Sequence, residues 1–169
     1  MTEPRASRPY VPDYGIPENP EGMLPWSHVL TRLTDALNYW VCTVDDAARP
    51  HATPVWGVVL DDTLYFDGSP ETRRGRNIAA NPAVAVHLGS GTDVVILHGD
   101  AREIRGAGRD FYVRLAAAYS AKYRSLGYDP SPDTWATGGL YSVTPRTAFA
   151  WTSFPEDATR WRFDAPGED

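Results

Sequence analysis

The sequence predicts a mainly β fold with α additions, namely a small barrel of five to six antiparallel strands with two or three helices. Short segments rich in Val, Tyr and Thr follow one another with only turns between them, so neighbouring strands must pair mostly antiparallel. Helical spacing of apolar residues occurs in a few separate places. With 169 residues, of which 42% are hydrophobic, the chain suffices for one domain whose core needs no disulfide or metal.

The N-terminal region is predicted to differ from the rest of the chain. Residues 1–25 contain six prolines and little apolar periodicity, which predicts an extended arm in front of a domain of residues 26–169. A helix is expected from Trp26, with Ser27 as a candidate cap. Its apolar face follows helical spacing through Trp26, Val29, Leu30, Leu33 and Leu37.

The strands and the remaining helices follow in order. Strands are expected at YWVCTV, HATPVWGVVL, TLYFDG, AVAVHL, DVVILHGDAREI and LYSVTPRTAFAWT. In AVAVHL, Val84, Val86 and Leu88 alternate with smaller residues and should face the core. The segment RRGRNIAAN predicts a short helix that ends at Asn81-Pro82. A helix from about Gly108 to Lys122 should bury Phe111, Leu115, Ala118 and Tyr119, and a long loop follows it.

Composition excludes several classes of protein. A net charge of −6 argues against a broad nucleic-acid surface. No metal site is expected, because the four histidines lie far apart and Cys42 is the lone cysteine, placed in an apolar run that predicts a buried thiol. The sequence lacks the G-x-S-x-G motif of many hydrolases and therefore does not indicate a hydrolase. Without a long apolar span or a signal-peptide core, the sequence predicts a cytoplasmic protein.

The most informative segment is SPETRRGRNIAANP, which contains Arg73, Arg74 and Arg76 at the junction of a predicted strand and a predicted helix. Guanidinium groups and free N–H groups at such a junction can hold a phosphate together. The segment lacks the glycine patterns of Walker and Rossmann phosphate loops. The sequence therefore predicts a phosphate site of another kind, although Arg76 fits an exposed helix position equally well.

Several segments in a fixed order resemble one known family. HATPVWG, LYFDG, the S-x-x-T-R-R-x-x-x-I-x-x-N-P arrangement of residues 69–82, and AVAVHL are similar to the pyridoxamine 5'-phosphate oxidase-like FMN-binding split β-barrel superfamily. The resemblance covers about residues 28–150 and is closest to actinobacterial flavin/deazaflavin-dependent oxidoreductases, several of which use the deazaflavin coenzyme F-420 instead of FMN. It implies a split β-barrel of about six antiparallel strands and a homodimer whose second copy also covers the cofactor.

The same resemblance implies roles for individual residues. Arg73 and Arg74 would hold the cofactor phosphate, Thr72 would add a hydroxyl contact, and Asn77 would support the loop. The strand of Thr53, Pro54, Val55 and Trp56 would lie along the edge of the isoalloxazine ring. Pro54 agrees with this, because a strand interrupted by proline has polar backbone groups that need a partner. Trp56 is open to two interpretations, a wall of the pocket or a residue of the core.

The expected function is that of an oxidoreductase in which FMN or F-420 exchanges a hydride with a small organic substrate. No side chain is required to be catalytic, and four aromatic residues are candidate proton donors or pocket residues: Tyr119, Tyr123, Trp135 and Tyr141. The alternative is a non-catalytic module that carries the cofactor. The C-terminal segment ATRWRF has no histidine, which disfavours pyridoxine-phosphate oxidase activity and haem binding as the family's members perform them. An RNA-binding barrel would need Tyr65 and Phe66 as stacking platforms.

Overall fold

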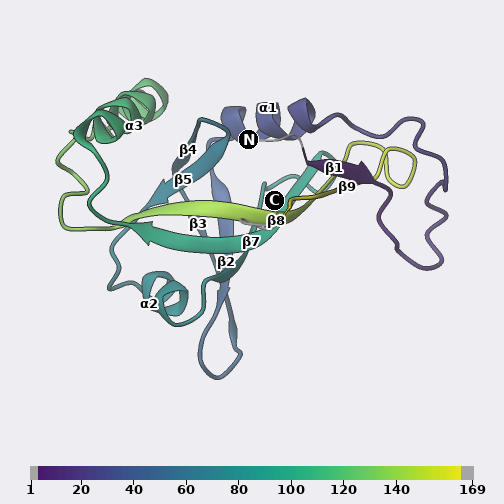
Figure 1. Ribbon diagram of the computed structural model, residues 1–169, viewed down its shortest axis with the longest axis horizontal. Helices are drawn as coiled ribbons and strands as arrows, with labels where there is room; N and C mark the ends of the chain where they lie inside the picture. The colour runs from purple at the N-terminus through teal and green to yellow at the C-terminus, as the bar shows by residue number, and fades with distance from the viewer. Residues whose placement is uncertain (1–3, 165–169) are drawn as a thin grey trace.

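A computed structural model describes residues 4–164 and confirms the mainly β, antiparallel architecture with three α-helices (Figure 1). The strands are β1 (Arg5–Ser7), β2 (Tyr39–Val44), β3 (Pro50–Val55), β4 (Gly57–Leu60), β5 (Thr63–Asp67), β6 (Ala83–His87), β7 (Val94–Ile104), β8 (Leu140–Trp151) and β9 (Thr159–Arg162). The α-helices are α1 (Trp26–Asp35), α2 (Arg73–Ala80) and α3 (Arg109–Tyr123), and the one-turn 3-10 helix η1 (Arg124–Leu126) follows α3.

The strand order explains how the barrel closes. The sheet runs β1-β9-β8-β7-β6-β2-β3, while β5 pairs with both β8 and β4. The strand predicted over residues 51–60 is two strands, β3 and β4, which only Trp56 separates. Because β3 pairs with β2 and β4 pairs with β5, this short connection links the two sides of the barrel. In the view of Figure 1, α1 lies above the long β7–β8 pair, α2 lies below it, and α3 lies at the end far from β1 and β9.

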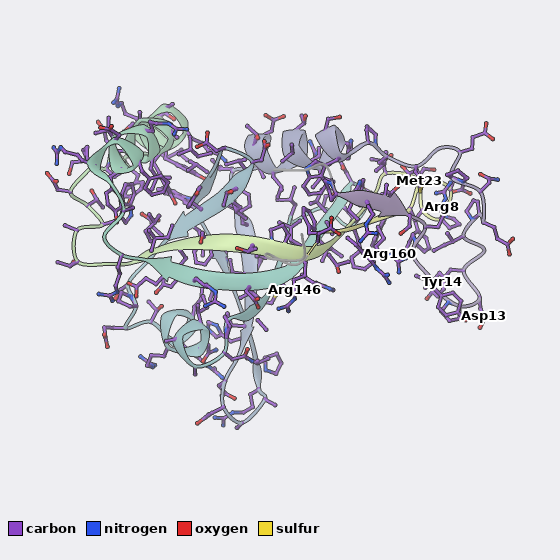
Figure 2. The ribbon with its side chains drawn as sticks, viewed as in Figure 1. Arg8, Asp13, Tyr14, Met23, Arg146 and Arg160 are labelled. Carbon is purple, nitrogen blue, oxygen red and sulfur yellow. The ribbon has the colours of Figure 1, made fainter. Side chains whose placement is uncertain are left out.

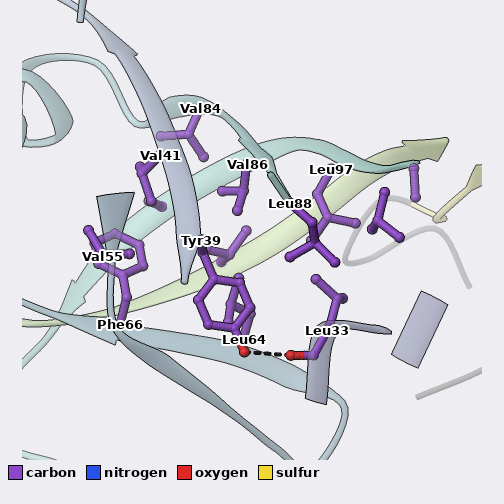
Figure 3. Packing of buried hydrophobic residues seen from close by; sticks show 14 of the residues in the cluster. Leu33, Tyr39, Val41, Val55, Leu64, Phe66, Val84, Val86, Leu88 and Leu97 are labelled. Carbon is purple, nitrogen blue, oxygen red and sulfur yellow. Dashed lines mark hydrogen bonds between the residues drawn. The ribbon is translucent and has the colours of Figure 1, made fainter. Parts of the chain in front are cut away.

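The main core fills the barrel from the inner faces of the strands, as the predicted alternation requires (Figure 3). Val84, Val86 and Leu88 are buried as expected. Tyr39 is also fully buried, and its hydroxyl donates to the carbonyl of Leu33 at 2.5 Å. A second cluster lies between α3 and β4 and consists of the buried residues Val58, Leu115, Ala116, Tyr119, Tyr123, Trp135 and Leu140.

Several local predictions need correction. Helix α1 begins at Trp26 as predicted, but Pro25 is its N-cap residue and no side chain caps it, so Ser27 does not have the predicted role. The helix ends at Asp35, which leaves Leu37 46% exposed instead of on the buried face. Cys42 is only partly buried, because it lies on the outer face of β2.

The N-terminal arm is tied to the other end of the chain. β1 pairs antiparallel with β9, and neither strand is among those predicted. Arg8 donates hydrogen bonds to the carbonyls of Asn19 at 2.9 Å and Glu156 at 2.8 Å, and also to those of Glu21 and Ala158. Figure 2 shows Arg8 near the base of the arm and Asp13 with Tyr14 at its outer end. One guanidinium group therefore fixes the arm against the segment before β9.

The described helices are too short or too polar to cross a lipid bilayer.

Candidate functional site

Helix α2 presents its N-terminus between the β2–β3 hairpin and the end of β5, and Thr72 is the residue that caps it. The Thr72 hydroxyl accepts a hydrogen bond from the N–H of Gly75 at 3.1 Å and donates to the carbonyl of Ser69 at 2.8 Å. This arrangement satisfies one of the free N–H groups of the first turn. It also uses the only hydroxyl proton of Thr72, so in this geometry the side chain has none to donate to a phosphate oxygen.

Arg73 points from α2 toward the tip of the β2–β3 hairpin. Its Nη2 lies 3.2 Å from Oδ2 of Asp45, and its side chain is 47% exposed. Asp45 also accepts a bond from Nε of Arg49 at 2.9 Å, and hydrogen bonds from Arg49 hold the pKa of its carboxyl below the usual value. A cavity of about 510 Å³ lies here and is lined by Asp45, Asp46, Arg49, Arg73, Arg76, Asn77 and Ala80. Arg73 is thus available to a ligand from solvent.

Arg74 points in a different direction and is buried, whereas a charged residue at a strand-to-helix junction is expected to be exposed. Only 9% of the residue is exposed, and Nη1 donates to the Thr53 hydroxyl at 3.0 Å. Its guanidinium carbon lies 5.6 Å from the centroid of the Phe66 ring. Nε has no hydrogen-bond partner within residues 4–164. Burial lowers the pKa of Arg74, while Tyr141 and Asp67 oppose this shift.

The predicted ring-edge residues, Thr53 to Trp56, lie at the open edge of the sheet, because β3 is the last strand of its path. Pro54 pairs in register with Trp40 of β2, and a proline is tolerated there because the other side of β3 has no strand. Val55 is buried in the main core. Trp56 is partly buried, and its ring stacks on that of Tyr123 with a centroid distance of 4.8 Å.

Asn77 is buried on the inner side of α2, where its Nδ2 donates to the Thr43 hydroxyl of β2 at 2.9 Å. The bond joins α2 to β2 of the barrel. The structure therefore brings Thr53 and Arg74 into direct contact and places Asn77 on the side of α2 that faces β2. Arg73 lies on the same helical turn but faces the hairpin tip.

The four aromatic candidates are all buried in this chain. Tyr119 donates to the Tyr65 carbonyl at 3.4 Å, and the Tyr123 hydroxyl lies 2.7 Å from the Gly57 carbonyl oxygen. Burial raises the pKa of Tyr119 well above the usual value and that of Tyr123 to about 12. The Tyr141 hydroxyl has no partner within the described part of the chain, and Trp135 binds Asp67. None of these phenols is poised to exchange a proton with solvent.

Two polar residues near the site escaped the sequence analysis. Asp67 at the end of β5 accepts hydrogen bonds from the Tyr128 hydroxyl and from Nε1 of Trp135 at 3.3 Å, and burial raises the pKa of its carboxyl. Lys122 of α3 donates to the Tyr39 hydroxyl at 2.9 Å and to the Gly57 carbonyl at 3.1 Å. No periodicity marks Asp67, but Lys122 is the only lysine of the chain and adjoins a predicted aromatic stripe.

The outer face of the sheet carries apolar and aromatic side chains at neighbouring positions. Trp40 is 37% exposed and stacks on the ring of His87 across the β2–β6 pair, with a centroid distance of 6.3 Å. The register adds Pro54 on one side of this pair and Ile96 with Phe149 on the other. We call this row, Pro54, Trp40, His87, Ile96 and Phe149, the outer-face row.

The described residues support neither a metal site nor an RNA-binding surface. Within residues 4–164, no group of three His, Cys, Asp or Glu side chains is arranged to hold a metal ion. Phe66, one of the two rings that an RNA-binding surface would need, is fully buried inside the barrel. Tyr65 packs its ring against Phe111 of α3. Neither ring is thus free to stack on a base.

Comparisons with known proteins agree with this architecture. A family model described as pyridoxamine 5'-phosphate oxidase matches residues 28–151. The comparison with curated proteins finds none that matches the sequence.

Many solved structures share the fold. An F-420 reductase is 22% identical with a TM-score of 0.53, and the match covers 70% of this chain and 93% of that one. A conserved hypothetical protein from Mycobacterium tuberculosis is 13% identical with a TM-score of 0.61, covering 76% and 85% of the two chains. A haem storage protein from Vibrio cholerae is 14% identical with a TM-score of 0.53, covering 71% and 87%. At these identities the likeness shows the fold alone.

Proposed function

The chain belongs to the pyridoxamine 5'-phosphate oxidase family, and from this premise we propose that it is an oxidoreductase that binds FMN or the deazaflavin F-420. Its reaction is the transfer of a hydride between the cofactor and a small organic substrate. The F-420 reductase among the structural neighbours is consistent with the deazaflavin, and the family name with FMN.

The observation that carries the proposal is the environment of Arg74. Arg74 is nine-tenths buried and donates to the Thr53 hydroxyl and to the Asp67 carbonyl, while its Nε has no partner within residues 4–164. Such a buried guanidinium group is costly unless an anion or another acceptor completes its hydrogen bonds. Arg74 lies at the N-terminus of α2, where the helix dipole also favours a negative charge. Its partner Thr53 belongs to the open-edge strand β3. An anionic group bound at Arg74 would therefore lie next to a strand with free backbone groups.

The residues fit two parts of a phosphorylated flavin-type cofactor, its phosphate and its ring. Arg73 and Arg74 would hold the phosphate from two sides of the first turn of α2. The free edge of β3 from Thr53 to Trp56 would offer backbone N–H and C=O groups to the polar edge of the ring, and Pro54 would offer only its carbonyl. Asn77 would act indirectly by keeping α2 against β2.

The chain's own contribution to the reaction is to bind and orient. When bound, the cofactor supplies the hydride chemistry, and the protein needs to place a substrate over the ring and exclude water. The buried phenols of Tyr119 and Tyr123 are engaged with backbone carbonyls, so we assign neither of them a proton-transfer role.

A homodimer is part of the proposal. The outer-face row forms an apolar strip on the sheet, beside the open edge of β3 where the ring would lie. Aromatic side chains on such a strip are typical of interfaces between copies of a chain. A second copy packed there would cover both the strip and the exposed face of the cofactor.

The non-catalytic carrier remains the second candidate, because one observation favours it. Asp67, the carboxylate whose charge acts on Arg74, is mostly buried and is held by Tyr128 and Trp135, so it is not free to exchange a proton with a substrate. A module that only stores a cofactor needs no side chain to transfer a proton. The haem storage protein among the neighbours has the same fold, although this likeness does not indicate haem as the ligand of this chain.

The test is a titration of the purified protein with FMN, F-420 and haem, followed by native mass spectrometry. The proposal expects a complex with FMN or F-420 at micromolar or lower concentration and a change in its visible spectrum when a substrate and a reductant or oxidant are added. A cofactor that binds and never changes spectrum with any of a broad set of substrates supports the carrier. Binding of haem alone contradicts both candidates.

A further inference from the structure

We infer that Lys122 is a positioning residue for the ring-edge strand: it fixes the corner between β3 and β4 and thereby makes cofactor binding depend on pH. The inference rests on the proposed function, because it concerns the strand that would hold the ring. Lys122 lies at the C-terminal end of α3, and the corner is the segment Trp56-Gly57.

Gly57 is held by α3 through both of its backbone groups. Its N–H donates to the Tyr123 hydroxyl at 2.9 Å, and its carbonyl lies 2.7 Å from that hydroxyl and 3.1 Å from Nζ of Lys122. The residue must be a glycine, because a Cβ there would come within 2.5 Å of the Tyr65 carbonyl oxygen and 3.2 Å of the Tyr39 ring. The corner is thus defined by side chains of α3 and by close packing.

A count of protons shows what Lys122 adds. The Tyr123 hydroxyl lies within reach of two acceptors, the carbonyls of Gly57 and of Leu37, at 2.7 and 2.9 Å, but it has a single proton to donate. Lys122 supplies the second donor to Gly57, so both carbonyls are satisfied at once. Without the amine, one of them would be left unpaired in a mostly buried region, and the corner would lose its fixed position.

The remaining contacts of the amine explain its sensitivity to pH. Nζ lies 5.0 Å from the Tyr39 ring centroid and 5.5 Å from that of Tyr123, and it donates to the Tyr39 hydroxyl at 2.9 Å. Burial lowers the pKa of Lys122 to about 8, and Asp35 at the end of α1 opposes this shift. The phenols of Tyr39 and Tyr123 stay neutral because burial raises their pKa values. The amine is therefore the group at this corner that titrates near pH 8.

The consequence reaches the ring-edge strand through Trp56. This residue precedes Gly57 directly, and its ring stacks on Tyr123, whose hydroxyl binds both groups of Gly57. When the amine loses its charge, its hydrogen bond to Gly57 weakens, because a charge-assisted bond becomes a neutral one. The end of β3 then becomes less well fixed, and a ring that depends on this strand binds less tightly.

The experiment measures the dissociation constant of FMN, or of F-420 if that is the cofactor, from pH 7 to 9.5. Four proteins are compared: the parent chain, Lys122→Met, Lys122→Arg and the control Arg114→Met. Arg114 lies on the exposed side of α3 and pairs with Asp61 at 2.5 Å, away from the corner. Circular dichroism and melting curves establish that each variant is folded.

Affinity of the parent should fall as the pH passes about 8. Lys122→Met should bind the cofactor about tenfold more weakly at pH 7, in line with the loss of one buried hydrogen bond. Its affinity should not show the fall near pH 8, which we call the step. Lys122→Arg keeps a charged donor with a pKa above the tested range, so it should bind like the parent at pH 7 and lack the step. Arg114→Met should behave like the parent.

The outcomes separate this inference from the proposed function. If the parent binds neither FMN nor F-420, the proposed function fails and this inference fails with it. If the parent binds and Lys122→Met binds equally well, or if Lys122→Arg retains the step near pH 8, the positioning role is refuted while the proposed function stands. Should Lys122→Met not fold, Lys122→Arg alone decides through the presence or absence of the step.

Discussion

Arg74 of α2 and Thr53 of β3 are joined by a hydrogen bond of 3.0 Å between Nη1 and the threonine hydroxyl. This bond connects the helix that would hold a phosphate to the strand that would hold a ring. Among the residues that the structure describes, Nε of this guanidinium group has no hydrogen-bond partner, and Arg74 has little exposure to solvent. Under the proposed function a bound anion completes its hydrogen bonds, and this can be tested directly.

Replacing Arg74 by Met should affect affinity and stability in different ways. The variant keeps the apolar stem and removes the charge, so cofactor binding should weaken by about 1.5–3 kcal/mol, the usual contribution of a hydrogen bond to a charged group. The free energy of unfolding without cofactor should not fall by more than about 0.5 kcal/mol, because a poorly paired buried charge adds little stability. Titration and urea unfolding measure the two quantities. Arg76→Met is the matched control, and a large loss of stability with normal binding would contradict the assignment.

Thr72→Ala should destabilise the protein through the start of α2. The hydroxyl that caps the N–H of Gly75 is lost, and the cost is about 1 kcal/mol. Thr72→Ser restores the cap and should recover most of the stability, which urea unfolding checks. Because the hydroxyl proton is already donated to Ser69, we expect cofactor affinity to change much less than in Arg74→Met. Equal losses of affinity in the two variants would show that Thr72 contacts the phosphate.

Lys122 should make stability rise with pH between about 8 and 10. Its pKa is lowered to about 8 in the folded protein from 10.5, so in this window the unfolded chain binds more protons than the folded one. Unfolding then becomes harder as the pH increases, by about 1 kcal/mol, because solvent screens the partly exposed amine. Above pH 10 the trend reverses, because Tyr39 and Tyr123 have raised pKa values and ionise first in the unfolded chain.

Urea unfolding at several pH values checks this effect on the protein without cofactor. Lys122→Met should lack the rise and should lose stability gradually toward pH 10, where the tyrosines of the unfolded chain begin to ionise. A parent profile that is flat or falls over the same window would show that the amine is not held at a lowered pKa.

Trp40→Glu should separate the two copies of the proposed homodimer. Trp40 belongs to the outer-face row, is 37% exposed and stacks on His87 of the neighbouring strand β6. A charge there should be tolerated by the monomer and disfavoured at an apolar interface. Analytical ultracentrifugation should find the parent chain at twice the mass of 18.7 kDa and the variant at that mass. A monomeric parent at micromolar concentration would overturn the dimer.

Trp56→Phe should lower stability and leave cofactor affinity nearly unchanged. The indole stacks on Tyr123 at 4.8 Å and packs on Tyr128 at 5.8 Å, so it belongs to the second core cluster as well as to the predicted ring edge. A phenyl ring keeps part of this packing, and we expect a loss of about 1 kcal/mol. Melting curves and a cofactor titration are both needed. Unchanged melting with altered affinity would instead make Trp56 a wall of the pocket.

The sequence predicted the barrel well because its strands alternate clearly, as in Val84 and Val86. It did not reveal the pairing of β1 with β9, since a strand of three residues carries too little pattern to be recognised. The candidate site was predicted from the order of its segments, but the burial of Arg74 was not anticipated. A signal was present, because Arg74 precedes Asn77 and Ile78 by three and four residues and so shares their buried helical face.

Other features of the site depend on contacts between distant parts of the chain. Lys122 and Gly57 are 65 residues apart, and Asp67 meets Trp135 across 68 residues. Neither pair leaves a trace in local spacing. The apolar stripe on α3 predicted the burial of Tyr119 but not that of Tyr123. The hydrogen bonds of both hydroxyls to backbone carbonyls could be known only from the fold.

The pairing of β1 with β9 has a consequence for how the chain acquires its structure. Arg5 lies opposite Arg162, so this part of the sheet joins the two ends of the described chain and encloses nearly all of it in one loop. Pairing residues so far apart in sequence requires the ends of the chain to come together, so we expect this contact to form after the barrel strands have brought them close. During synthesis the barrel strands β2 to β8 can therefore assemble first, and Arg8 can fasten the arm only after the segment around Glu156 has left the ribosome.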